Sequence, residues 1–197
     1  DVLGSIIIFS VVASILKKNL EGNEAIFSNM TYIIQDYREL LFYLGVGIVC
    51  AFIGPLWMSV ILKLRRAKFV VFKHHKLTVV FLTFLFIAGI SYINPESLGS
   101  GHQNVEQMLM ELIQDWRLIL SLLIFKFVAT SISYASGVIG GLLIPVVVMG
   151  AMIGSLVGAG SENFFPGITT NSSTYALVGM GAFFASVIRA PFTSILV

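Results

Sequence analysis

Three glycines and a proline stand inside an apolar stretch of the chain, where they could bind an anion. Gly137, Gly140 and Gly141 precede Pro145 in the sequence SGVIGGLLIP. Because proline is best tolerated in the first turn of a helix, this spacing predicts that a helix begins here. The first N–H groups of a helix have no partner within it and carry the positive end of its dipole. Such a helix end, surrounded by apolar sequence, would hold a small anion without trapping it, which suits conduction or transport.

The composition places these residues in a membrane protein. The chain is 57% hydrophobic and 11% charged, whereas soluble domains carry about 25% charged residues. Several apolar runs are shorter than the roughly 20 residues of a straight membrane span. The runs cover residues 2–16, 40–62, 77–93, 118–125 with a continuation past Lys126, 145–160, 175–188 and 192 onward. Short segments interrupted by Gly and Pro predict broken or tilted helices. A soluble protein is the disfavoured alternative, because too little polar sequence is present to coat a core.

The charged residues predict an orientation. Six of the twelve Lys and Arg residues lie in the acid-free segment Lys63–Lys76. We expect this segment to be a cytoplasmic loop that is attracted to anionic lipid headgroups. The segments then expected outside, 17–39, 94–117 and 161–174, hold nine of the ten acids. A nucleic-acid partner is not expected, because the basic segment is short and flanked by apolar runs.

Other positions have competing interpretations. The four-residue spacing of Gly150, Gly154 and Gly158 predicts close helix packing. Lys126 lies inside an apolar run, and an intramembrane ionisable residue is a functional candidate. Pairing of Lys126 with a carbonyl or carboxylate of another helix is the alternative. We interpret Arg189 as an anchor at the cytoplasmic end of a helix, with direct anion contact as its alternative.

Two long motifs carry a resemblance to a known family. The stretch SGVIGGLLIPVVVMGAMIGSLVG resembles the segment of CLC chloride channels and chloride–proton antiporters that contains their G-x-F-x-P anion-binding motif. The stretch YALVGMGAFFASVIRAPFTSILV resembles the pair of helices that follows it, and the stretches at residues 1–16 and 43–64 resemble the family more loosely. The resemblance implies an all-helical inverted repeat, a homodimer with one anion pathway per subunit, and this chain as most of the second repeat.

The resemblance also implies a site. Gly141, Leu142, Leu143, Ile144 and Pro145 occupy the G-x-F-x-P positions, and the backbone N–H groups of Leu142 and Leu143 would contact the anion. Leu143 stands where the family has phenylalanine, so the pore wall differs while the backbone contact is kept. The motifs that separate channel from antiporter belong to the first repeat, so both modes remain open.

From these observations we expect an all-α polytopic membrane protein with broken and tilted helices. A single transmembrane region should cover residues 1–197, as part of a longer protein. The expected function is transmembrane transport of chloride or another small anion, as a channel or a chloride–proton antiporter. The alternatives are a non-transporting helical membrane scaffold or subunit and another inverted-repeat secondary transporter.

The expected surroundings and partners follow from the same interpretation. We expect an integral protein of the plasma or inner membrane, in contact with the lipid bilayer and with a second copy of itself. No enzyme activity and no cofactor are expected, chloride being the substrate. A metal site at His74 and His75 is disfavoured, because no third ligand stands at a useful spacing.

Overall fold

The chain divides into two compact units, Asp1–Thr31 and Tyr32–Val197, and each is described by itself. In the first unit the described residues are helical. This division does not test the expectation of one transmembrane region over residues 1–197, which stays a prediction. The computed structural model describes residues 9, 11–13, 15–16, 18–20, 37–71, 76–93, 99, 101–110, 112–113, 115–137, 140–164 and 172–188.

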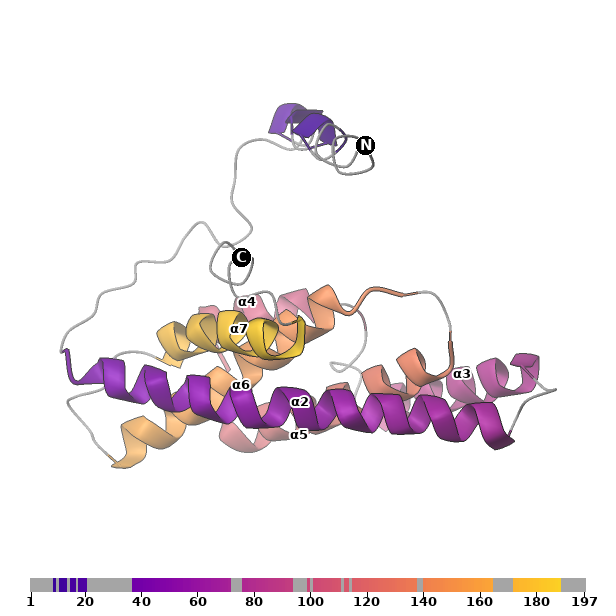
Figure 1. Cartoon of the computed structure of the whole chain (residues 1–197). Helices are drawn as coiled ribbons and strands as arrows, with labels where there is room; N and C mark the ends of the chain where they lie inside the picture. Colours follow the sequence, from indigo (N-terminus) through magenta and orange to yellow (C-terminus); the bar gives the residue numbers. More distant parts are fainter. Residues whose placement is uncertain are drawn as a thin grey trace. The chain divides into compact units, whose positions relative to one another are not determined.

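The second unit is built from helices throughout its regular described elements (Figure 1). Five of these helices coincide with apolar runs of the sequence. The sixth, α4, lies in segment 94–117, which is expected to connect two spans. The all-α expectation is therefore confirmed. In chain order the helices are α2 Glu39–Val71, α3 Lys76–Ile93, α4 His102–Leu109, α5 Trp116–Ala135, α6 Leu143–Phe164 and α7 Ser172–Ile188.

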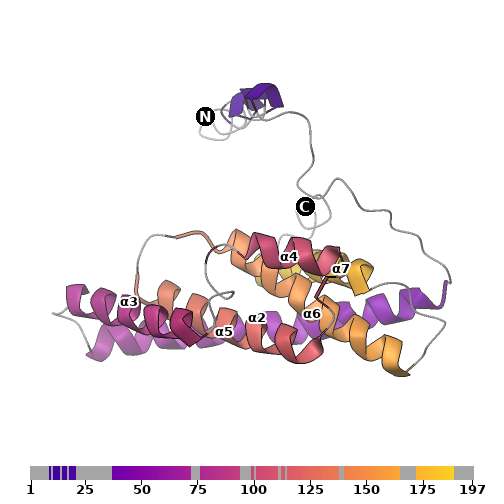
Figure 2. The same ribbon diagram turned by 180° about the vertical axis from the view of Figure 1, so that it is seen from behind.

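Helices α6 and α7 form the centre of this unit. Helix α7 packs against α2, α4 and α6, while α6 also packs against α2, α4 and α5. The view from behind shows α4 lying over α6 and α7, and α3 packs against α5 (Figure 2). The fully buried large side chains of these two central helices include Met149, Met152, Tyr175, Phe183 and Phe184.

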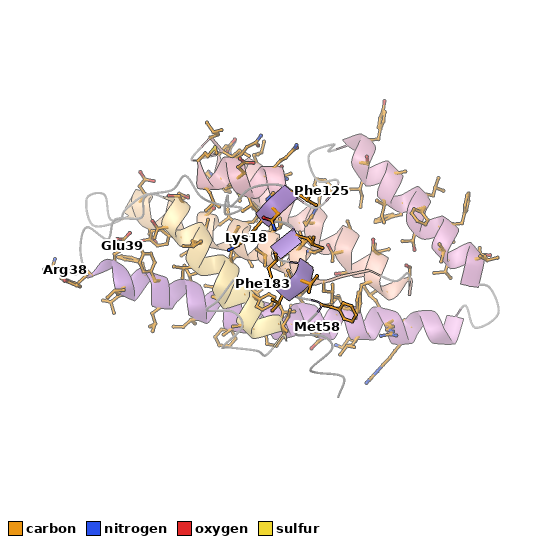
Figure 3. All side chains as sticks on the ribbon, turned by 90° about the horizontal axis from the view of Figure 1, so that it is seen from above. Lys18, Arg38, Glu39, Met58, Phe125 and Phe183 are labelled. Atoms are coloured by element: carbon orange, nitrogen blue, oxygen red, sulfur yellow. The ribbon has the colours of Figure 1, made fainter. Side chains whose placement is uncertain are left out.

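An aromatic cluster joins α2, α5 and α7. The ring of Trp57 lies 5.5 Å from that of Phe127 and 6.0 Å from that of Phe183, measured between centroids. The indole N–H of Trp57 donates a hydrogen bond of 2.8 Å to Ser131 Oγ on α5. Because the polar atom of Trp57 is paired, the whole side chain can be buried without an unsatisfied donor. Figure 3 labels Phe183 on α7, where this helix crosses α2.

The basic segment differs from its prediction. The sequence predicts a loop over Lys63–Lys76, and this is wrong for most of the segment, because α2 continues to Val71 and α3 begins at Lys76. Leu, Arg, Lys and Ala are good helix formers, and cations near a helix C-terminus interact favourably with the dipole. The side chains of Lys63, Arg65 and Arg66 are exposed. Residues 72–75, with His74 and His75, lie outside the described part.

Among the described helices, three are long and apolar enough to cross a membrane, over Glu39–Ala67, Trp116–Ala135 and Leu143–Glu162. The first has 29 residues, which at 1.5 Å each gives about 43 Å, well above the roughly 30 Å of a hydrocarbon core. This length requires tilt or extension into the headgroup region. The apolar helices Leu77–Tyr92 and Ser172–Ile188 are shorter. The chain is an integral membrane protein with helices of unequal length, as the sequence predicts.

Candidate anion-binding site

Helix α5 ends at the first glycine of the cluster. The N–H of Ser136 donates to Ile132 O at 2.9 Å, and the N–H of Gly137 donates to Tyr134 O at 3.2 Å. Gly137 has a φ of 78°, which is the left-handed conformation that commonly terminates helices and that glycine adopts without strain. Gly137 is therefore explained as the residue that stops α5. The sequence pattern groups Gly137 with the residues that start the next helix, and this grouping is wrong for Gly137.

Helix α6 begins at Leu143, inside apolar sequence as predicted. The N–H of Val146 donates to Leu142 O at 3.0 Å, closing the first turn. Leu143 and Ile144 precede Val146, so their N–H groups lack an intrahelical acceptor, and Pro145 has no N–H. The first turn contains no acidic residue.

The residues just before α6 have room around them. A Cβ added at Gly140 or at Gly141 would meet no described atom within 4 Å. Leu143 and Ile144, the first two residues of the helix, are 51% and 49% exposed. All five predicted site residues therefore lie together at one accessible helix start, with Gly141 and Leu142 leading into it.

The chemistry available at this helix start comes from the backbone. N–H groups without an acceptor in the helix and the positive end of the α6 dipole point toward Gly141 and Leu142, a combination that favours a negatively charged ligand. The neighbouring side chains of Leu142, Leu143 and Ile144 are apolar. They can shape the site, but they contribute no charge of either sign to it.

Close contact with α7 holds α6 in place. A Cβ added at Gly150 would lie 2.5 Å from Gly179 O, and one added at Gly154 would lie 2.7 Å from the carbonyl carbon of Tyr175. At Gly158 an added Cβ would come within 2.9 Å of the Tyr175 ring. The predicted packing role of this glycine spacing is confirmed. It allows the two helix backbones to touch, which positions the start of α6 on a rigid support.

Lys126 lies near the middle of α5 and is buried, with 4% of its surface exposed. Its Nζ donates a hydrogen bond of 2.7 Å to Gly99 O. Of the two interpretations of this residue, pairing with a carbonyl is confirmed. Arg189, the other charged candidate near the end of α7, lies outside the described residues.

A second buried polar group was not expected from the sequence. Glu39, at the start of α2, has no exposed surface and is labelled in Figure 3 beside Arg38. One turn later, the ring of Tyr43 packs edge-on against that of Tyr175 at 4.9 Å between centroids. The four-residue spacing of Glu39 and Tyr43 indicates a shared helix face. Nothing in a single sequence indicates that α7 would cover that face.

Comparison with known proteins relates the whole chain to anion transporters. The sequence profile of a family described as Voltage gated chloride channel matches residues 1–197. A putative chloride channel protein, ClcB-like, from Ralstonia nicotianae is 31% identical over 194 residues, which are 98% of this chain and 45% of that protein. An H(+)/Cl(-) exchange transporter ClcA from Vibrio campbellii is 27% identical over 201 residues, covering 98% of this chain and 42% of that protein. The ClcA of Salmonella agona is 27% identical over 193 residues, with 94% and 40% covered. The chain thus spans less than half the length of these relatives.

Proposed function

Because the chain belongs to the voltage gated chloride channel family, whose profile matches residues 1–197, we propose that it forms part of a transmembrane pathway for chloride or another small anion. The named relatives include both a channel and exchange transporters. The proposal therefore covers conduction and proton-coupled exchange. A scaffold without transport, or a transporter of another substrate, has no support from these relatives.

The start of α6 is the observation that carries the proposal. The helix begins at Leu143, which is also the first residue of a candidate membrane span. In a membrane, away from water, unpaired N–H groups are costly. An anion held by the backbone at Leu142 and Leu143 would satisfy these groups. Because the helix end carries only partial charge, the ion can leave again, as transport requires.

The complete pathway would need more than this chain. In inverted-repeat transporters the binding site lies at the interface between the repeats, and the chain spans 45% of its ClcB-like relative. We place Gly141, Leu142, Leu143, Ile144 and Pro145 on one wall of the site, with the rest of the protein forming the other. A homodimer in the plasma or inner membrane is part of the same proposal.

Transport by the full-length protein tests the proposal. Liposomes that contain it should release chloride faster than empty liposomes. Liposomes that contain residues 1–197 alone should not, because half of the coordination shell is missing. Absence of chloride flux from the well-folded full-length protein would contradict the proposed function. Flux through residues 1–197 alone would contradict the need for a second half.

The orientation can be tested at the two ends of α2. We propose that its basic C-terminal end faces the cytoplasm, as the distribution of Lys and Arg favours. In a Cys50→Ala background, Tyr37→Cys should react with an impermeant thiol reagent added to intact cells, and Arg66→Cys should not. Both positions are exposed, so burial does not explain a difference. The reverse labelling pattern would overturn this orientation.

A further inference from the structure

Lys126 brings a cationic side chain into the interior of the helical unit. It is the eleventh of the 20 residues of α5 and is almost completely buried. Charged residues at such depth are costly and usually line a pathway or pair with polar groups. Its Nζ contacts Gly99 O at 2.7 Å, which fixes the position of the ammonium group between α5 and the segment that leads into α4.

The segment that accepts the hydrogen bond from Lys126 contains two glycines, which let the ammonium group come close to its backbone. Gly99 and Gly101 have φ values of 73° and 80°, a left-handed conformation in which other residues are strained. A Cβ added at Gly101 would lie 3.3 Å from Lys126 Nζ and 2.8 Å from Val148 Cγ1. The ammonium group and Val148 therefore both border the space that a side chain at Gly101 would fill.

This contact places the ammonium group beside the first turns of α6. Val148 follows Leu143, the first residue of α6, by five residues, or about 7.5 Å along the axis at 1.5 Å per residue. From this spacing we estimate that the ammonium group lies roughly 10 Å from the backbone of Leu143, and a unit charge at that distance acts on an ion in a medium of low dielectric constant. The cation and the dipole of α6 then act in the same direction on an anion at Leu143.

We propose that Lys126 sets the anion affinity of the α6 start through its positive charge, without touching the anion. This inference rests on the proposed function and adds to it a residue that determines anion affinity. The hydrogen bond to Gly99 O holds the ammonium group in place, and Gly101 leaves the space for it. The effect is one of net charge, so it should be equal for monovalent anions of different size.

The test compares Lys126→Gln with Lys126→Arg in the purified full-length protein, with chloride and bromide affinities measured by calorimetry. Both substitutions keep a donor for Gly99 O, but only Arg keeps the charge. Lys126→Gln should weaken the binding of both anions by roughly tenfold. This is the effect expected for the loss of a unit charge about 10 Å away at an effective dielectric constant of about 20. Lys126→Arg should stay close to the wild type.

Each other outcome has a definite meaning. Equal losses in both variants, unchanged binding in Lys126→Gln, or a loss for only one of the two anions would overturn the charge effect. Failure of Lys126→Gln to give a monodisperse, cooperatively unfolding protein would assign the residue to folding and also overturn it. Absence of anion binding by the wild type would overturn the proposed function together with this inference, whereas a binding wild type with an unaffected Gln variant overturns the inference alone.

Discussion

Two groups of glycines lie close together in the sequence but have opposite surroundings. On α6, a Cβ added at Gly150 or Gly154 would come within 3.0 Å of backbone atoms of α7. Before α6, a Cβ added at Gly140 or Gly141 would meet no described atom within 4 Å. Packing among the described residues explains the first pair and not the second. Substitutions in the first pair should therefore be measured as changes in stability, and those in the second as changes in ligand binding.

The largest expected effect is a loss of stability on substitution of a glycine that packs against α7. Gly154→Ala would push a methyl group into the backbone of α7 at Tyr175. Because backbone cannot move aside as a flexible side chain can, we expect a loss of about 3 kcal/mol, the upper part of the range for overpacking. Thermal unfolding of the purified full-length protein in detergent measures this loss.

A matched control is available on the same helix. Gly160 also lies on α6, but a Cβ added there would meet no described atom within 4 Å. Gly160→Ala should leave stability unchanged or raise it by up to about 1 kcal/mol, because alanine is the better helix former. Equal unfolding temperatures for Gly154→Ala and Gly160→Ala would remove the distinction between packed and open glycines.

The next effect concerns the donors at the helix start. Leu143→Pro removes one N–H at a position where helices tolerate proline, while Leu143→Ala keeps the N–H and shortens the side chain. A hydrogen bond to a charged group contributes roughly 1.5–3 kcal/mol, so the proline variant should bind chloride about ten- to a hundredfold more weakly. Calorimetry on the full-length protein measures both variants. Equal losses would mean that the Leu143 side chain, and not its backbone, determines affinity.

The smallest effect on stability is expected for the glycines that precede α6. In Gly141→Ala the added methyl group would meet no described atom within 4 Å. The free energy of unfolding should therefore stay within about 0.5 kcal/mol of the wild type. Chloride affinity should nevertheless fall by about tenfold, because the added methyl group would stand beside the donors. A variant that loses stability and keeps its affinity would place Gly141 with the packed glycines.

Much of the fold could be predicted because membrane helices can be recognised from local runs of apolar residues. The apolar runs gave α2, α3, α5, α6 and α7. The burial of α4 could not be predicted in the same way, since its eight residues bury only one face, with Val105, Met108 and Leu109 inside. The prediction of a loop over Lys63–Lys76 was wrong because basic residues can mark the end of a membrane span while the helix itself continues.

The site was predictable only where its parts are neighbours in the sequence. Gly141 and Pro145 indicated the start of α6 correctly, because proline position and helix start are linked locally. Gly137 belongs to the end of α5, a distinction that needs its φ angle. The contact between Lys126 and Gly99 joins residues 27 positions apart. No periodicity in a single sequence could have paired them.

The central claim is that an anion binds to the backbone at the start of α6. The most direct measurement is anomalous diffraction from crystals of the full-length protein grown in bromide. The account predicts a bromide peak at hydrogen-bonding distance from the backbone nitrogen of Leu142 or Leu143, weakened or lost in Leu143→Pro. A well-resolved helix start without a peak there, with bromide bound elsewhere along the pathway, would contradict it.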